Sequence, residues 1–159
     1  MKTLVAYFSA SNTTGILAKK LAEAVGADLF EIKPTIPYSE KDLNWKNPFA
    51  RCNKEKIGKK DVPITDKIEH FEEIDFFYIG FPIWYYGAPN IIESFLKKYD
   101  FSGKKIALFA TSGGSNMGKT AEKLKPFLSD TAHLLAAKVF PASTNAEALK
   151  SWAEKVTEG

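Results

Sequence analysis

The sequence predicts a single α/β domain built on a five-stranded parallel sheet, and three observations support this prediction. Segments typical of strands and of helices alternate five times along the 159 residues. The main strand segments are continuous apolar runs, which is typical of parallel strands buried on both faces. No internal repeat or interdomain linker interrupts the alternation. We therefore expect one three-layer, doubly wound domain spanning residues 1–159.

The first strand–helix–strand unit is expected within residues 2–32. Residues 2–8 form a short run rich in aromatic and β-branched side chains, which predicts a central strand. A helix follows residues 9–15, because apolar side chains recur at helical spacing while lysine and glutamate lie outside that face. Gly26 is expected to end this helix. Residues 28–32 then predict a second short strand, closed by Lys33-Pro34.

The remainder of the chain predicts three further strand–helix pairs after a less regular region at residues 33–65. Within that region, Asn47-Pro48 is typical of a helix start, so we expect a helix to about Ile57, where Gly58 would stop it. Strands are expected at residues 76–81, 105–110 and, more weakly, 138–140. Helices are expected at residues 91–99, 119–128 and 146–156.

Composition excludes several functional classes. No stretch of about 18 apolar residues predicts a membrane span, and the apolar run at the N-terminus is too short for a signal peptide. The single cysteine, Cys52, cannot form an internal disulfide and suits the reducing cytoplasm. His70 and His133 lack the spacing of metal ligands, so we expect no metal site.

The net charge of +3 is mild, and much of the basic excess lies in one run of lysines. Nucleic-acid binding would require exposed aromatic residues interleaved with basic ones, and this run contains none. We interpret it as a solvated surface, which would still favour an acidic protein partner. The run comprises Lys54, Lys56, Lys59 and Lys60.

The first loop with chemical potential follows the first strand. The start of the next helix has unpaired backbone N–H groups and a partial positive charge, which favour a phosphate. The loop has neither a lysine nor the glycine spacing of triphosphate and dinucleotide sites, which favours a terminal monophosphate. One hydroxyl would suffice to cap the helix, but this loop places five polar side chains together: Ser9, Ser11, Asn12, Thr13 and Thr14.

The second loop follows the third strand and contains three consecutive aromatic residues between prolines. They cannot all face one core, so at least one ring is expected to be exposed where a planar ligand could stack on it. Ordinary core packing is the alternative for any single ring. The residues concerned are Pro82, Ile83, Trp84, Tyr85, Tyr86 and Gly87.

The third loop follows the fourth strand and is rich in glycine and serine. Glycine allows close approach of the backbone to a ligand, and freed backbone groups could bind the edge of a heterocycle. Ligands in such sheets bind at the carboxyl ends of the strands, where the strand order reverses; with the order 2-1-3-4-5 the three loops converge. The third-loop candidates are Ser112, Gly113, Gly114, Met117 and Gly118.

With these loops in view, the chain resembles the flavodoxin family over its whole length, and most closely its short members. The resemblance rests on the hydroxyl-rich loop at residues 9–14, on Pro-Ile-Trp-Tyr at 82–85 and on Thr-Ser-Gly-Gly-Ser at 111–115. It departs at Asn12, where many members carry glycine. A further matching pattern comprises Tyr38, Asp42, Leu43, Trp45, Arg51 and Glu55.

The resemblance implies a non-covalently bound FMN that carries one or two electrons between redox partner proteins. The first loop would hold the ribityl phosphate, the other two would line the isoalloxazine ring, and no side chain would act as a catalyst. Tyr38, Trp45 and Arg51 would either fold the long loop over the flavin or pack it. Electron-carrying flavodoxins are typically acidic, whereas this chain is slightly basic, and its second and third loops contain no carboxylate. We therefore expect a less negative low-potential couple than in acidic members.

Three alternatives share this fold. The main one is an FMN-dependent NAD(P)H:quinone-type oxidoreductase, which needs open space over the ring; the aromatic cluster mildly favours a covered ring. A phosphoacceptor receiver domain would need acidic residues where Ser9 and Pro82 stand. A flavin-free interaction module would not require all three loops. Hydrolysis has little support, because Cys52 has no evident histidine partner.

Overall fold

The computed structural model describes residues 2–10, 12–36, 38–39, 41–43, 46, 50–52, 62–83, 87–112 and 116–158. Its centre is a five-stranded parallel sheet in the order β2-β1-β3-β4-β5. The strands are β1 (Thr3–Tyr7), β2 (Asp28–Glu31), β3 (Phe76–Pro82), β4 (Lys105–Thr111) and β5 (His133–Val139). Both the strand order and the three-layer arrangement predicted from the sequence are confirmed.

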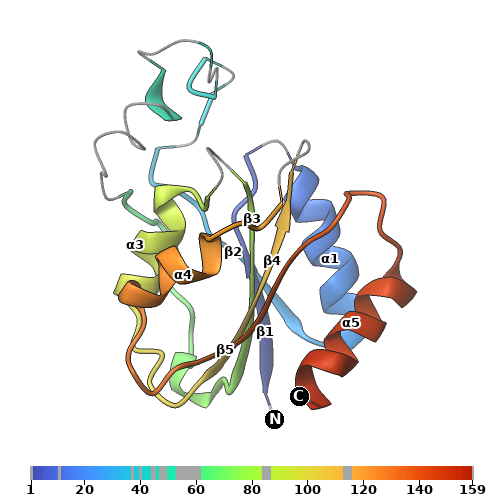
Figure 1. Cartoon of the computed structure of the whole chain (residues 1–159). Helices are drawn as coiled ribbons and strands as arrows, with labels where there is room; N and C mark the ends of the chain where they lie inside the picture. Colours follow the sequence, from blue (N-terminus) through green and yellow to red (C-terminus); the bar gives the residue numbers. More distant parts are fainter. Residues whose placement is uncertain are drawn as a thin grey trace.

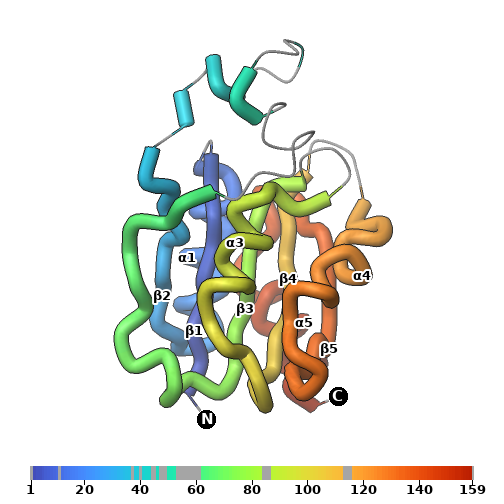
Figure 2. Tube along the Cα trace, turned by 90° about the vertical axis from the view of Figure 1, so that its left-hand side faces the viewer, coloured from blue at the N-terminus to red at the C-terminus, as the bar shows by residue number. Residues whose placement is uncertain are grey.

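Two layers of helices cover the sheet (Figure 1). On one face lie α1 (Thr13–Val25) and α5 (Ala146–Glu158), and on the other lie α3 (Asn90–Lys98) and α4 (Thr120–Leu124). Two short 3₁₀ turns, η1 (Phe71–Glu73) and η2 (Lys125–Phe127), complete the described elements. The tube view shows the carboxyl ends of the strands and the segment after β2 at the same end of the molecule (Figure 2).

The apolar runs form these strands because successive side chains feed two separate cores. In β4, Ile106 and Leu108 pack on the α3 face, whereas Ala107 and Phe109 pack on the α1 and α5 face. All four are at most 1% exposed. A strand buried on both faces needs apolar residues at every position, which explains why β1, β3 and β4 were predictable from continuous runs.

Helix α1 begins and ends where backbone geometry requires it. Asn12 precedes the helix with φ of 68°, a left-handed conformation that asparagine tolerates better than most residues. Gly26 follows the helix with φ of 67°, and its N–H donates to Ala22 O. The end predicted at Gly26 is confirmed.

Two predicted elements were wrong in extent. The fifth strand was expected at residues 138–140 but runs over His133–Val139; its leucine and alanine residues have helical propensity, and pairing with β4 overrides it. The helix expected at residues 119–128 is α4 followed by η2, because Pro126 cannot donate a backbone hydrogen bond. The helix expected from Asn47 to Ile57 falls largely on residues outside the described ranges.

Candidate functional site

The turn between β1 and α1 presents the start of a helix to the carboxyl edge of the sheet. The first bond within the helix runs from Ile16 N–H to Asn12 O, with N···O 3.0 Å. The N–H groups of the residues before Ile16 therefore precede the helical ladder and have no acceptor within it. The side chain of Asn12 makes no capping bond to them. This turn has the backbone donors and the positive dipole end that bind an anion.

Ser9 contributes a hydroxyl to this turn. Its Oγ is buried, and it has no hydrogen-bond partner among the described residues. A buried hydroxyl without a partner is costly by about 1–3 kcal/mol, so such groups point to a missing ligand atom. The observation fits the predicted role of Ser9 as a donor to a phosphate oxygen.

Gly15, which the sequence analysis did not single out, keeps the turn open. A Cβ added to Gly15 would lie 3.0 Å from Asn12 Oδ1, 3.3 Å from Tyr7 Cε2 and 3.6 Å from Ser9 Oγ. Three side chains thus converge on a space that any larger residue would fill. The only sequence signal was a glycine in the first turn of a helix, where it is otherwise unfavourable.

Tyr7 forms the floor beneath this space and connects it to β2. Its hydroxyl donates to Glu31 Oε1 at 3.4 Å. Burial raises the pKa of Tyr7, and the neighbouring Glu31 carboxylate raises it further, so the hydroxyl stays protonated near neutral pH. The bond fixes Glu31 at the end of the adjacent strand.

Thr14 differs from the other members of the first loop. It is 1% exposed, and its Oγ1 lies 2.7 Å from Thr111 Oγ1, the side chain of the last residue of β4. Its hydroxyl therefore bonds to the neighbouring strand in the structure. Asn12 is exposed, Thr13 is half-buried, and Ser11 lies outside the described residues.

The second and third loops leave the same edge of the sheet as the first. Pro82 pairs with Thr111 at the ends of β3 and β4, and Ile83 N–H donates to Thr111 O at 2.8 Å. Ile83 and Met117 pack against the core below, Gly87 is buried, and Gly118 adopts φ of 52°. Ser112 is half-buried; the predicted residues outside the described ranges are Trp84, Tyr85, Tyr86, Gly113 and Gly114.

The segment after β2 packs beside the first loop. The ring of Tyr38 meets that of Phe8 edge-on, with centroids 5.7 Å apart. Arg51 stacks on Tyr38, with its guanidinium carbon 4.0 Å from the ring centroid, and its Nη1 donates to Ile36 O at 2.6 Å. These contacts join Tyr38 and Arg51 to Phe8 and Ile36, and the choice between packing the long loop and folding it over the flavin stays a prediction. Trp45 lies outside the described residues.

A cavity of about 390 Å³ opens between this segment and the first loop. Phe8 and Tyr38 supply aromatic walls, Ala10 and Pro34 add apolar surface, and hydroxyl and charged side chains line the rest. The cavity borders the candidate phosphate turn through Ser9 and Ala10. The polar and remaining members are Ser9, Ala10, Glu31, Lys33, Pro34, Thr35 and Thr65.

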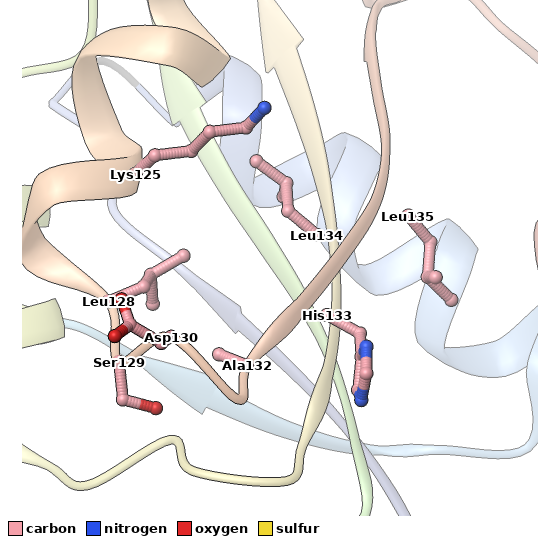
Figure 3. A pocket seen from close by; sticks show the side chains of 8 residues that line it. All are labelled: Lys125, Leu128, Ser129, Asp130, Ala132, His133, Leu134 and Leu135. Carbon is pink, nitrogen blue, oxygen red and sulfur yellow. The ribbon is translucent and has the colours of Figure 1, made fainter.

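A second cavity, of about 430 Å³, lies at the other end of the sheet (Figure 3). It includes His133, which pairs with Lys105 at the start of β4, far from Thr111 at that strand's end. In Figure 3 the side chains of His133 and Leu135 point away from Leu128. This cavity therefore has no convergent set of polar groups comparable to the first loop.

Among the described residues, His, Cys, Asp and Glu side chains nowhere gather in threes as they would around a metal ion. Within the same ranges no helix has the length and apolar character needed to cross a bilayer.

The chain is similar in sequence and in fold to several proteins of known structure. A protein from Bacteroides eggerthii assigned to the flavoproteins is 38% identical, with TM-score 0.91 and 98% of each chain covered. One from Bacteroides uniformis, also assigned to the flavoproteins, is 36% identical, with TM-score 0.90, covering 96% of this chain and 97% of that one. A Lactobacillus acidophilus flavoprotein solved in complex with FMN has 23% identity and TM-score 0.69, covering 96% and 98%. No curated protein matches the chain.

The sequence itself matches one family model along nearly all of its length. The model describes flavodoxins, and the match spans residues 2–156. It includes β1 to β5, the described helices α1, α3 and α4, most of α5, and the three loops at the carboxyl edge. The chain belongs to the flavodoxin family.

Proposed function

We propose that this flavodoxin-family chain binds one FMN without a covalent bond and carries one or two electrons between redox partner proteins. The observation that carries the proposal is the buried Ser9 hydroxyl, which has no partner among the described residues and lies at the N-terminus of α1. Gly15 leaves space beside it. Family membership and the FMN complex of the Lactobacillus acidophilus relative support the identity of the ligand.

Each loop has a distinct task in this proposal. Ser9, Ser11, Asn12, Thr13 and Thr14, with the N–H groups of the first turn of α1, hold the phosphate. Trp84 or Tyr85 covers one ring face, and Ile83, Tyr86 and Gly87 shape the surrounding pocket. The backbone of residues 112–114 binds the pyrimidine edge, with Met117 and Gly118 nearby. When bound, the flavin supplies the redox chemistry, and the protein supplies binding, stacking and hydrogen bonds.

The visible spectrum of the purified protein tests the proposal. We expect bands of oxidised flavin that persist after desalting, and FMN rather than FAD or riboflavin in the extracted cofactor. We expect steady-state turnover of NADH or NADPH with a quinone to be negligible. Rapid turnover would instead identify an FMN-dependent NAD(P)H:quinone-type oxidoreductase.

The distribution of charge favours an acidic redox partner. Residues 36–61 contain seven Lys or Arg against four Asp or Glu, and so account for the whole net charge of +3. The described parts of this segment lie beyond the carboxyl ends of the strands (Figure 1, cyan and teal). Lys41 and Lys46 are exposed there. A positive surface beside the site would attract an anionic partner at low salt.

Small charged oxidants test this charge effect without an identified partner. We expect oxidation of the reduced protein by ferricyanide to slow by about tenfold as salt rises from low to high ionic strength, while oxidation by hexaammineruthenium(III) accelerates. Lys41→Glu combined with Lys46→Glu should remove both trends. Lys105→Glu with Lys155→Glu, at exposed positions on β4 and α5 away from this segment, is the charge-matched control. Equal effects of the two pairs would contradict a local surface.

The potential of the bound flavin provides a further prediction. Repulsion between nearby carboxylates and an anionic reduced flavin lowers the second couple, and residues 82–89 and 111–118 contain no carboxylate. We therefore expect a less negative second couple than in acidic flavodoxins. Potentiometric titration measures it, and a strongly depressed second couple would contradict the prediction.

Cys52 is buried and is the single cysteine of the sequence. A protein without internal disulfides suits the reducing cytoplasm, where we propose that it works.

A further inference from the structure

One residue, Thr111, is bonded to all three loops of the site. Its Oγ1 lies 2.7 Å from Thr14 Oγ1 in the first turn of α1, although 97 residues separate the two. Its carbonyl oxygen accepts the N–H of Ile83, at the start of the second loop, at 2.8 Å. Thr111 is also the last residue of β4, so the third loop begins with its neighbour Ser112.

The surroundings of Thr111 make it a firm anchor. It is 4% exposed, and Ala110 before it is fully buried. Ala110 O accepts the N–H of Phe140 at 2.8 Å, which ties this end of β4 to the chain just after β5. The hydroxyl pair is likewise buried, so water does not compete for it. A buried hydroxyl bond of this kind is directional and is costly to leave half-made.

We infer that Thr111 is a positioning residue that fixes the distance between the phosphate-binding turn and the two ring-binding loops, acting through Thr14 and Ile83. The inference rests on the proposed function. A ligand whose two ends are covalently joined gains full affinity from both subsites only when their separation is held at the matching value. Thr111 thereby sets how much the phosphate of FMN adds to the binding of the ring.

The test compares FMN with riboflavin, which lacks only the phosphate. The dissociation constant of riboflavin divided by that of FMN reports the contribution of the phosphate to binding. Both constants are measured by flavin fluorescence on the apoprotein. Thr111→Val should lower this ratio by about tenfold through weaker FMN binding, with riboflavin affinity unchanged. Thr111→Ser retains the hydroxyl and should restore the ratio. Thr3→Val is the control, because Thr3 is the first residue of β1 and lies at the edge of the sheet opposite the site. This substitution should leave both affinities unchanged.

A double-mutant cycle separates the effect of the Thr14–Thr111 hydrogen bond from a general effect on packing. Since Thr14→Val removes the same bond from the other side, adding Thr111→Val to it should lower the ratio no further. Should Thr111→Val not fold, Thr111→Cys, which keeps a weak donor, should give an intermediate ratio. An unchanged ratio, whether both affinities fall equally or neither falls, would overturn this inference and leave the proposed function intact. Additive losses in the cycle would do the same. A wild-type apoprotein that binds neither flavin would refute the proposed function as well.

Discussion

Thr13→Glu is expected to weaken FMN binding by about 100-fold while changing riboflavin affinity by less than about twofold. Thr13 is the first residue of α1 and is half-buried. A carboxylate there would lie beside the proposed dianionic phosphate and repel it. The positive end of the helix dipole stabilises the same carboxylate by about 0.3–1 kcal/mol, so the apoprotein should not lose stability.

Titration of the apoprotein with both flavins measures this effect, together with urea unfolding of the apoprotein. Thr13→Gln has the same length without the charge and is the matched control; its loss of FMN affinity should be about tenfold smaller. The combination of intact folding, intact riboflavin binding and lost FMN binding is specific to a phosphate at this turn. If both flavins weaken equally, the phosphate does not bind at Thr13.

Gly80→Ala is expected to destabilise the apoprotein by about 3 kcal/mol. Gly80 lies in β3 between Tyr7 of β1 and Phe109 of β4, its partners in register. The ring of Phe109 lies over it, so closely that an added Cβ would overlap the ring. Phe109 is fully buried and cannot move aside without disturbing the core under α1 and α5.

Replacing the obstructing ring provides the matched test. Phe109→Leu alone should destabilise the protein through lost burial, but Gly80→Ala should be much less costly in that background. Urea unfolding of the four apoproteins gives the coupling energy directly. A Gly80→Ala protein as stable as the wild type, or fully additive losses in the cycle, would show that Phe109 does not occupy this space.

The parts of the fold that could be predicted are those with a local cause. Strands β1, β3 and β4 are continuous apolar runs because both of their faces are buried, and Gly26 ends α1 because it alone of its neighbours adopts a left-handed conformation easily. The convergence of the three loops follows from the strand order. The candidate site was therefore predictable at the level of loops.

The parts that could not be predicted depend on contacts between distant residues. Strand β5 is an edge strand of mixed exposure, and pairing with β4 determines its length. The roles of Gly15 and Gly80 follow from side chains on other elements that approach them in space. The bond between Thr14 and Thr111 joins residues with no sequence pattern between them. Single residues of this kind become visible only when the elements are placed in three dimensions.

Calorimetric titration of the wild-type apoprotein with FMN, and separately with riboflavin, tests the central claim most directly. If the N-terminus of α1 and the buried Ser9 hydroxyl hold a phosphate, FMN binds at one site per chain, and riboflavin binds at the same site at least about 100-fold more weakly. Equal affinities for the two flavins, or no heat of binding with FMN, would contradict the account.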